Sequence, residues 1–364
     1  MQPIISNSSD FLFIYEAIQS NPNGDPDQEN KPRMDYDTKT NLVTDTRIKR
    51  FIRDYLKDSG KEIFVDLVED RKVDMSQRIE GVVKKTLKDE LDNLENTFKS
   101  DDLFKLLKTI INASKLKGNE KKEDYLEIVW SILTISTTKE KNDLKKDKHL
   151  KQFAEELRNI KQINLEILAY MVKSKFIDIR LFGSAFAITG FNLPYTGPIQ
   201  LNWGYSFNKV ELIDSSSIVT IMNDDSSTFG KDYRVHYSLL GFNGTINAPA
   251  AKTTGLANDD VLEFRKAIWE SIPASPTRSK LNQYPKLYLE IVYNEGVSNG
   301  QFGDLRNFVE TEPKEGISDK QVRKFKDLSI DLSALKKLIA DDKNGENKIK
   351  EVIVKTSADF DFSL

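Results

Sequence analysis

The pattern of apolar and polar positions at the start of the chain predicts a strand and then a loop. Asp10 to Gln19 is a run of apolar and aromatic residues of the length that a buried β-strand needs. Asn21 to Asp35 is dense in Asn, Pro, Gly and Asp, the residues that favour turns. We therefore expect the chain to leave the core at about residue 20 and to return to it after residue 35.

A basic amphipathic helix is predicted after this loop, with Thr44 or Asp45 as its N-cap. Its apolar positions recur with the spacing of one helix face and comprise Ile48, Phe51, Ile52, Tyr55 and Leu56. The other face presents four cations, which are Arg47, Lys49, Arg50 and Arg53. The helix thus has one side suited to the core and one suited to solvent or to an anion.

The middle of the chain has a different composition. Residues 61–175 are rich in Lys, Glu, Leu and Ile, with few breakers, and predict several amphipathic helices. Strand patterns return from Ile177, followed by a helix over 259–272, a strong strand beginning at Lys286, and a short helix and final strand after Asp327. This order predicts an α+β fold of the ferredoxin-like or RRM-like type, with a large helical insertion.

Composition excludes several classes of protein. Apolar residues make up 38% and charged residues 30% of the 364 positions, which is typical of a soluble globular protein. No apolar run is long enough to span a membrane, and the N-terminus lacks a secretory signal pattern, so we expect a cytoplasmic protein without a membrane partner. Zero cysteines and two histidines leave few ligands for a transition metal, and no Walker-type loop occurs. We therefore expect no metal and no cofactor.

The charge distribution nevertheless favours a polyanionic partner. The net charge is −3, but residues 31–57 contain eight Lys or Arg against four acids. A loop with free backbone N–H groups, a helix N-terminus and several guanidinium groups together suit phosphate. The alternative is that the loop is only a turn and the helix only a solvated face, and the residues alone leave that alternative open.

Two further segments have candidate nucleic-acid chemistry. The Pro-flanked loop at 277–280 offers Arg278 and Lys280 for phosphate, although a plain polar connection is equally compatible with the pattern. Trp203, Tyr205 and Phe207 alternate and would share one face of a strand. They could stack on bases, but such a stripe more often packs in a core.

The motifs in these segments resemble a known family. NPNGDPD, PRMD and LVTDTRIKRFIRDYL are similar to the N-terminal signature of the backbone subunit of CRISPR type I-B and I-C Cascade complexes, in the RAMP superfamily. IRLFGSAF, TGPIQLNWGYSF, YSLLGFNGTINAPAAKTTGL and TRSKLNQYPKLYLEIVYNEG match it further along, in the same order. The segment at about 61–175 matches least well.

The resemblance implies an RRM-like palm at 1–60 and 176–364, a helical insertion called the fingers at 61–175, and a β-hairpin thumb at about 211–236. It implies that several copies stack along a guide RNA and that each thumb displaces one base. The strand SSIVTIM and a return strand YRVHYS would form the thumb, whose apolar wedges would be Ile221, Met222 and Phe229. Candidate RNA-binding residues are then Asn21, Asn23, Arg33, Thr44, Arg47, Lys49, Arg50, Arg53, Arg278 and Lys280.

We therefore expect a non-catalytic subunit that binds guide RNA irrespective of its sequence and presents it for pairing with target DNA. Its partners would be other copies of itself and other Cascade subunits. One alternative is an endoribonuclease of the same superfamily that cuts guide precursor or target RNA, with formal catalytic candidates Asp25, Asp35, Asp37, His149 and His236. Another alternative is a protein–protein adaptor whose basic helix is only a solvated face.

Overall fold

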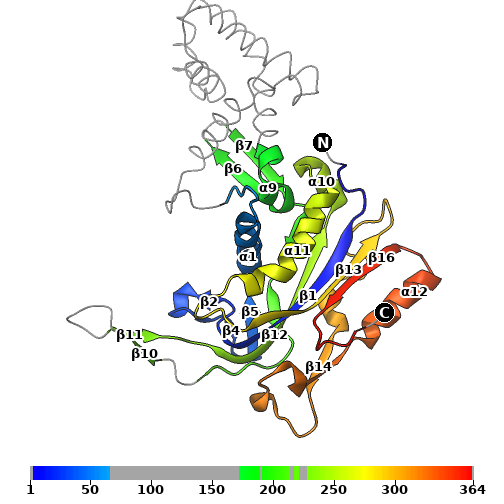
Figure 1. The fold of residues 1–364 in the computed structure, drawn as a ribbon. Coiled ribbons are helices and arrows are strands. Elements are labelled where there is room, and N and C mark those ends of the chain that lie inside the picture. Colours follow the sequence, from blue (N-terminus) through cyan, green and yellow to red (C-terminus); the bar gives the residue numbers. More distant parts are fainter. Residues whose placement is uncertain (1–2, 66–171, 189–190, 214–216, 221–227, 363–364) are drawn as a thin grey trace, which may run out of the picture. The chain divides into compact units, whose positions relative to one another are not determined.

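The structure, a computed structural model, describes residues 3–65, 172–188, 191–213, 217–220 and 228–362 (Figure 1). The chain divides into two compact units, Met1–Lys61 with Gly197–Leu364, and Glu62–Thr196. Most of the segment predicted to form the fingers lies outside the described residues. The division into palm and fingers therefore stays a prediction.

The first unit is built on an eight-stranded antiparallel sheet. Its centre is β1 (Ser9–Ser20), which lies between β12 (Val235–Ile246) and β13 (Gln283–Tyr293) and is antiparallel to both. The sheet order is β16-β13-β1-β12-β9-β5-β4, and β8 also pairs with β12. The outer strands are β4 (Met34–Asp35), β5 (Thr40–Val43), β8 (Ile199–Leu201), β9 (Gly204–Ser206) and β16 (Ile349–Thr356). The predicted α+β class is confirmed, with an antiparallel sheet.

Both faces of the sheet are covered, and for this reason β1 has an almost continuous apolar sequence. On one face Phe11 contacts Phe264 of α11 (Asn258–Ala274) edge-on, with ring centroids 5.6 Å apart. On the other face Leu12 belongs to a buried cluster that includes Leu335 and Ile339 of α12 (Ser333–Asn344). Strands buried on two sides show no polar alternation.

The predicted basic helix is α1 (Asp45–Asp58), and its N-cap is Thr44, whose hydroxyl accepts a hydrogen bond from Arg47 N at 3.3 Å. Ile48, Phe51, Ile52 and Leu56 are buried, as the spacing predicts. The helix lies beside α11, on the same face of the sheet (Figure 1). The four cations of the basic face are half-buried rather than fully exposed to solvent.

The loop that precedes α1 has a defined shape. It contains the two-residue strands β2 (Gly24–Asp25) and β3 (Lys31–Pro32), which pair with each other, and a short turn of 3₁₀-helix between them. Gly24 is required because a Cβ there would lie 1.8 Å from Asn30 Oδ1. This close approach fixes the loop as a compact hairpin-like fold.

The predicted thumb contains a hairpin, but its return strand differs from the expectation. β10 (Ser217–Thr220) pairs with β11 (Thr228–Lys231). The segment YRVHYS does not complete the hairpin, because Val235 opens the long strand β12 and pairs with Ser20 of the central sheet. Ile221 and Met222 lie outside the described residues, and Phe229 is on β11 opposite Val219. The wedge roles of these residues stay predictions.

A second expectation is wrong in the second unit. The strand pattern predicted from Ile177 begins as helix α9 (Ile177–Phe182), and β6 (Gly183–Ile188) starts only at Gly183 and pairs with β7 (Phe191–Thr196). The buried carboxylate of Asp178 accepts hydrogen bonds from the backbone N–H groups of Phe64 (2.8 Å) and Val65 (3.1 Å). A short apolar run fits a buried helix as well as a strand, and this tertiary contact favours the helix.

Short elements complete the first unit. They are helix α10 (Ala248–Thr254) and the paired strands β14 (Glu310–Pro313) and β15 (Leu328–Asp331). No helix in the described part of the chain combines the length and the apolar character that crossing a bilayer requires.

Candidate functional site

Three segments meet beside the N-terminus of α1, and we call this surface the loop–helix site: residues 21–33, the first two turns of α1, and residues 277–281. Asn21 N donates to Ser279 O at 2.8 Å, which ties the first loop to the third segment. Asn23 Oδ1 accepts from both the backbone N–H and the hydroxyl of Thr44, each at 2.9 Å. The predicted residues Asn21, Asn23 and Thr44 are therefore brought together and hold the site in shape.

Two of the predicted cations lie side by side in this site. The Lys280 ammonium donates a hydrogen bond to the backbone carbonyl of Asn21, a neutral acceptor. Burial, and then the positive charge of Arg47, lower the pKa of Lys280 to about 7. Burial also lowers the pKa of Arg47, whose guanidinium lies 3.9 Å from the centroid of the Phe51 ring. Neither cation forms an ion pair with a described residue.

Several buried polar atoms around this pair have no hydrogen-bond partner among the described residues. They are Asn21 Oδ1, Arg47 Nε and the hydroxyl of Tyr15. Tyr15 is fully buried on β1, and burial raises its pKa while the nearby Arg47 lowers it. Sequence reasoning missed Tyr15 because the last aromatic of an apolar strand is indistinguishable from a core residue. Unpaired buried polar groups are costly, so their clustering marks a place where a polar ligand fits.

Most of the other predicted cations already have acidic partners. Lys49 pairs with Asp45 at 2.9 Å and Arg50 pairs with Asp54 at 2.7 Å, both one helical turn away. Arg53 is half-buried on the same helix. Such i,i+4 pairs are common along basic helices. The structure therefore separates Lys49 and Arg50, which have ion-pair partners, from Arg47, which has none among the described residues.

The remaining predicted cations pair at the edges of the site. Arg33 lies 3.3 Å from Asp25, and its guanidinium is 6.0 Å from the centroid of the Trp203 ring. Arg278 is exposed and lies 3.3 Å from Asp232. These weak, partly exposed contacts can exchange for a phosphate at little cost.

The base of the β10–β11 hairpin lies against the first loop. Glu29 accepts hydrogen bonds from Lys231 Nζ at 2.8 Å and from the Tyr233 hydroxyl at 2.9 Å, and these contacts lower the pKa of Glu29. Lys31 lies 5.0 Å from the centroid of the Tyr233 ring. The hairpin therefore extends from the edge of the loop–helix site (Figure 1).

Arg234 is a second residue that sequence reasoning missed. Its guanidinium donates to the carbonyls of Gln19 (3.0 Å) and Arg278 (3.1 Å) and pairs with Asp232. It thus fastens the segment carrying Lys280 to the end of β1. The sequence placed Arg234 in the predicted return strand YRVHYS and gave no sign of these contacts.

The aromatic stripe does not behave as one unit. Trp203 is 47% exposed, while Tyr205 and Phe207 are half-buried and contact each other edge-on. Arg306 lies 4.1 Å from the Tyr205 ring centroid and donates to the Trp203 carbonyl. Trp203 is therefore the one member of the stripe whose ring presents a large exposed surface, beside Arg33.

The formal nuclease candidates are dispersed. Asp25 pairs with Arg33, and Asp35 accepts from the Thr38 hydroxyl (2.8 Å) and the Asp37 N–H (3.1 Å), contacts that lower the pKa of Asp35. His236 is half-buried in β12, and His149 lies outside the described residues. Within the described ranges, no three acidic or histidine side chains form a group that could hold a metal ion.

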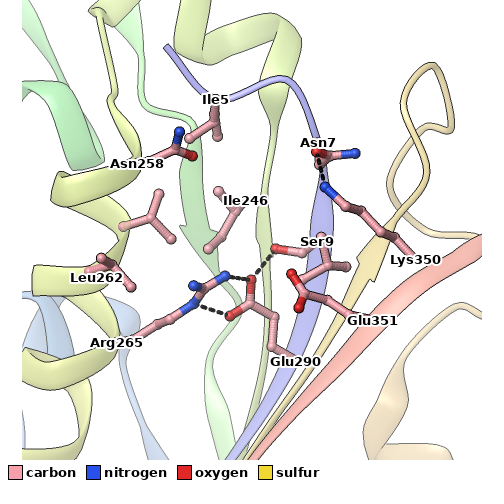
Figure 2. A pocket seen from close by; sticks show the side chains of 12 residues that line it. Ile5, Asn7, Ser9, Ile246, Asn258, Leu262, Arg265, Glu290, Lys350 and Glu351 are labelled. Carbon is pink, nitrogen blue, oxygen red and sulfur yellow. Dashed lines mark hydrogen bonds and ion pairs between the residues drawn. The ribbon is translucent and has the colours of Figure 1, made fainter. Parts of the chain in front are cut away.

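A cavity of about 240 Å³ lies elsewhere in the first unit, between α11 and the end of the sheet (Figure 2). Its floor is the buried Glu290, which accepts from Arg265 at 2.7 and 2.9 Å, from the Ser9 hydroxyl at 2.6 Å and from the Tyr288 hydroxyl at 2.7 Å. Arg265 and Glu290 compensate each other. The cavity therefore lacks the unbalanced charge found at the loop–helix site.

Known proteins match both the sequence and the fold. The family model described as CRISPR-associated protein Cas7 matches residues 7–333. A CRISPR-associated protein Cas7 from Haloferax volcanii is 28% identical over 336 residues, covering 90% of this chain and 82% of that protein.

Among solved structures, a chain of a CRISPR RNA-guided surveillance complex described as pre-nicking has a similar fold, with a TM-score of 0.50 and 14% identity. The match covers 98% of this chain and 94% of the other. The resemblance drawn from the motifs is thereby confirmed at the level of the family: the chain belongs to the CRISPR-associated Cas7 family.

Proposed function

We propose that this chain binds the ribose-phosphate backbone of a CRISPR guide RNA at the loop–helix site and leaves the base edges free to pair with target DNA. Several copies would coat one guide beside other Cascade subunits, in antiviral defence. Recognition by phosphate contacts positions a strand without reading its sequence. Sequence selection would then belong to base pairing, as in other RNA-guided effectors.

The observation that carries this proposal is the pair of cations at Arg47 and Lys280. Both are largely removed from water, and neither forms an ion pair with a described residue. The charge of Asp54, which is paired with Arg50, acts on Arg47 only from a longer distance, and no acid acts on Lys280. Burying a charge without compensation is unfavourable, so an external anion would stabilise the arrangement. The adjacent α1 N-terminus adds the positive end of a helix dipole, which also favours a phosphate.

The surroundings of the pair support a polynucleotide rather than a single small anion. Arg33 and Arg278 lie on either side with exchangeable partners, and the exposed ring of Trp203 offers a surface on which a base can stack. The hairpin of β10 and β11 extends from the same edge. We propose that it is the thumb, which separates one base from its neighbours.

We also propose that the sheet of the first unit is an RRM-like palm. In chain order, β1 is followed by α1, then by β8 and β9, then by β12, α11 and β13. The spatial order of the core strands is β13-β1-β12-β9, with antiparallel neighbours throughout. This is the βαββαβ arrangement of ferredoxin-like folds, extended at both edges.

We further propose that the chain does not cleave RNA. Asp25 is paired with Arg33, and Asp35 accepts hydrogen bonds within its own turn, so neither is held ready to activate a nucleophile. Purified chain incubated with labelled guide and complementary target RNA, with and without Mg²⁺, should leave both strands intact. Cleavage that Asp25→Ala or His236→Ala abolishes would contradict this.

The binding proposal is tested by fluorescence anisotropy with two unrelated single-stranded RNAs of equal length. We expect similar affinities for both, and an association constant that falls steeply with salt because each neutralised phosphate releases about 0.7 counterion. Arg47→Ala should weaken binding of both RNAs by about tenfold or more, since a charge-assisted hydrogen bond contributes about 1.5–3 kcal/mol.

The control is Lys337→Ala, which removes the same charge from an exposed position of α12, over the opposite face of the sheet. It should leave both affinities unchanged. Indifference of the wild-type chain to single-stranded RNA at low ionic strength would refute the proposal. A loss confined to one RNA would refute its sequence independence.

A further inference from the structure

Lys280 is held in surroundings that disfavour its charge. Its ammonium group donates to the carbonyl of Asn21, which is neutral, and it lies beside the positive charge of Arg47. The segment is fixed there, because Asn21 N donates to Ser279 O and Arg234 donates to the carbonyl of Arg278. These contacts hold the backbone beside Lys280 in place, and the hydrogen bond to Asn21 keeps its ammonium group in the site.

Four elements contribute charged or titratable groups to the site that holds Lys280. Helix α1 contributes Arg47, which acts on Lys280 directly, and also Arg50, which is paired with Asp54. The charge of Asp54 also raises the pKa of Arg47. From β1 comes the buried hydroxyl of Tyr15. The remaining groups, Arg278 from its own loop and Arg234 and Asp232 from the segment before β12, are paired with one another.

The balance of these groups favours a neutral amine. No acid bonds to Lys280 among the described residues, and burial together with Arg47 brings the pKa of Lys280 down to about 7. An exposed lysine keeps its charge to a much higher pH, with a pKa near 10.4. An anion bound beside Lys280 and Arg47 would reverse this balance, because a negative charge favours the protonated ammonium form.

We propose that Lys280 is mostly uncharged in the free protein under mildly alkaline conditions and takes up one proton from solvent when a backbone phosphate of the RNA binds beside Arg47. This inference rests on the proposed function and adds that RNA binding is linked to protonation of Lys280. The ε-amine forms one N–H bond with a proton supplied by water or buffer, and no bond of the RNA breaks. The phosphate, the new ammonium and the Arg47 guanidinium then form a compensated cluster.

The linkage has a definite sign. A negative phosphate raises the affinity of Lys280 for a proton, so the bound pKa lies above the free value of about 7. Between the two values, binding consumes one proton per site, and the association constant falls as pH rises. The limiting slope is about tenfold per pH unit, whereas below the free pKa this contribution to the pH dependence disappears.

Isothermal titration of the full chain with a single-stranded homopolymeric RNA measures the proton count directly. The titration is run at about pH 8 in two buffers of different ionisation enthalpy, HEPES and Tris, at low ionic strength. We expect the observed heat to differ between the buffers by the amount that corresponds to proton uptake for each bound protomer. The measurement needs no variant and uses the native protein.

Two substitutions assign the proton to Lys280. Lys280→Arg keeps a cation that does not titrate in this range and should bind RNA without that proton uptake. Lys280→Met should also lose the uptake and should bind more weakly. Lys337→Arg, at an exposed position of α12, should retain the uptake of the wild-type chain. Protons taken up by other groups persist in all variants and are subtracted by this comparison.

The outcomes separate the two proposals. RNA binding without proton uptake, or with the same uptake in Lys280→Arg, would overturn the linkage and leave the binding function standing. Absence of binding across the pH range at low salt would overturn the binding function itself. Uptake that is present in the wild-type chain and absent from both Lys280 variants would establish the linkage.

Discussion

Two parts of the same unit bury basic side chains in opposite ways. Under α11, Arg265 forms a bidentate contact with the fully buried Glu290, which also accepts a hydrogen bond from the Ser9 hydroxyl (Figure 2). The Tyr288 hydroxyl completes the carboxylate's hydrogen bonds. At the loop–helix site, Arg47 and Lys280 lie together and neither forms an ion pair with a described residue. The first arrangement is internally neutral and the second is not.

A third basic group shows that the difference is not one of burial. Lys286 is 4% exposed and lies between Glu16 (2.8 Å) and Asp359 (2.7 Å). It is more deeply buried than Lys280, yet the chain itself supplies its counter-charges. Compensation within the chain is thus what we expect of a structural ion pair, and lack of an ion-pair partner is what we expect of a cation that binds a ligand.

The largest effect is expected from Glu290→Ala. Removing this carboxylate leaves the partly buried Arg265 without its partner, and breaking a buried ion pair costs about 3–5 kcal/mol. Urea denaturation followed by circular dichroism measures the loss as a lower unfolding free energy. Glu351→Ala is the control, because Glu351 lines the same cavity but is exposed and should change stability by less than about 0.5 kcal/mol. Equal losses of unfolding free energy in the two variants would show that the Arg265–Glu290 ion pair is not a special source of stability.

A matched pair of lysine substitutions tests the comparison directly. Lys286→Met removes the cation between Glu16 and Asp359 and should cost about 3 kcal/mol at pH 8. At the same pH Lys280 is mostly neutral because its pKa is about 7, so Lys280→Met loses only one hydrogen bond, and its cost should stay within about 1 kcal/mol. A cost of Lys280→Met as large as that of Lys286→Met would show that Lys280 is a structural residue.

The cost of Lys286→Met should also depend on pH. Burial raises the pKa of Glu16 although Lys286 lowers it, so loss of Lys286 raises it further. The folded variant then holds the Glu16 proton more tightly than the unfolded chain does. Its stability is retained below the unfolded pKa of about 4.3 and falls as pH rises through the folded pKa. Unfolding free energies should therefore differ less from wild type at pH 5 than at pH 8.

The same contrast explains which parts of the molecule the sequence could predict. The α1 boundaries follow from the Thr44 cap and the helical spacing of its apolar residues, because both are local. By contrast, α9 depends on the hydrogen bonds of Asp178 with residues more than a hundred positions away, and the pattern predicted a strand there. Structure that depends on neighbouring residues could be predicted from the sequence, whereas structure that depends on hydrogen bonds between distant residues could not.

The site shows a similar division. The sequence placed Arg47 and Lys280 among thirteen RNA-binding candidates, but it gave no reason to rank them above Lys49 or Arg50. The ranking comes from ion pairs: Lys49 pairs with Asp45 and Arg50 with Asp54, each one turn away, whereas Arg47 and Lys280 form no ion pair with a described residue. Tyr15 and Arg234 were missed because their roles arise only where β1, α1 and the 277–281 loop meet.

The smallest effect is expected from the double substitution Lys49→Ala with Arg50→Ala. Both side chains already pair with acids one helical turn away, and such pairs contribute about 0.3–0.5 kcal/mol to stability. An RNA phosphate must compete with Asp45 and Asp54 for them, so the affinity should fall by less than about tenfold and equally for unrelated guides. Fluorescence anisotropy titrations of the double variant and of Arg47→Ala, run in parallel, measure the two RNA affinities and their ratio. If the double variant bound RNA more weakly than Arg47→Ala does, then Lys49 and Arg50, rather than the pair of Arg47 and Lys280, would make the principal contact with RNA.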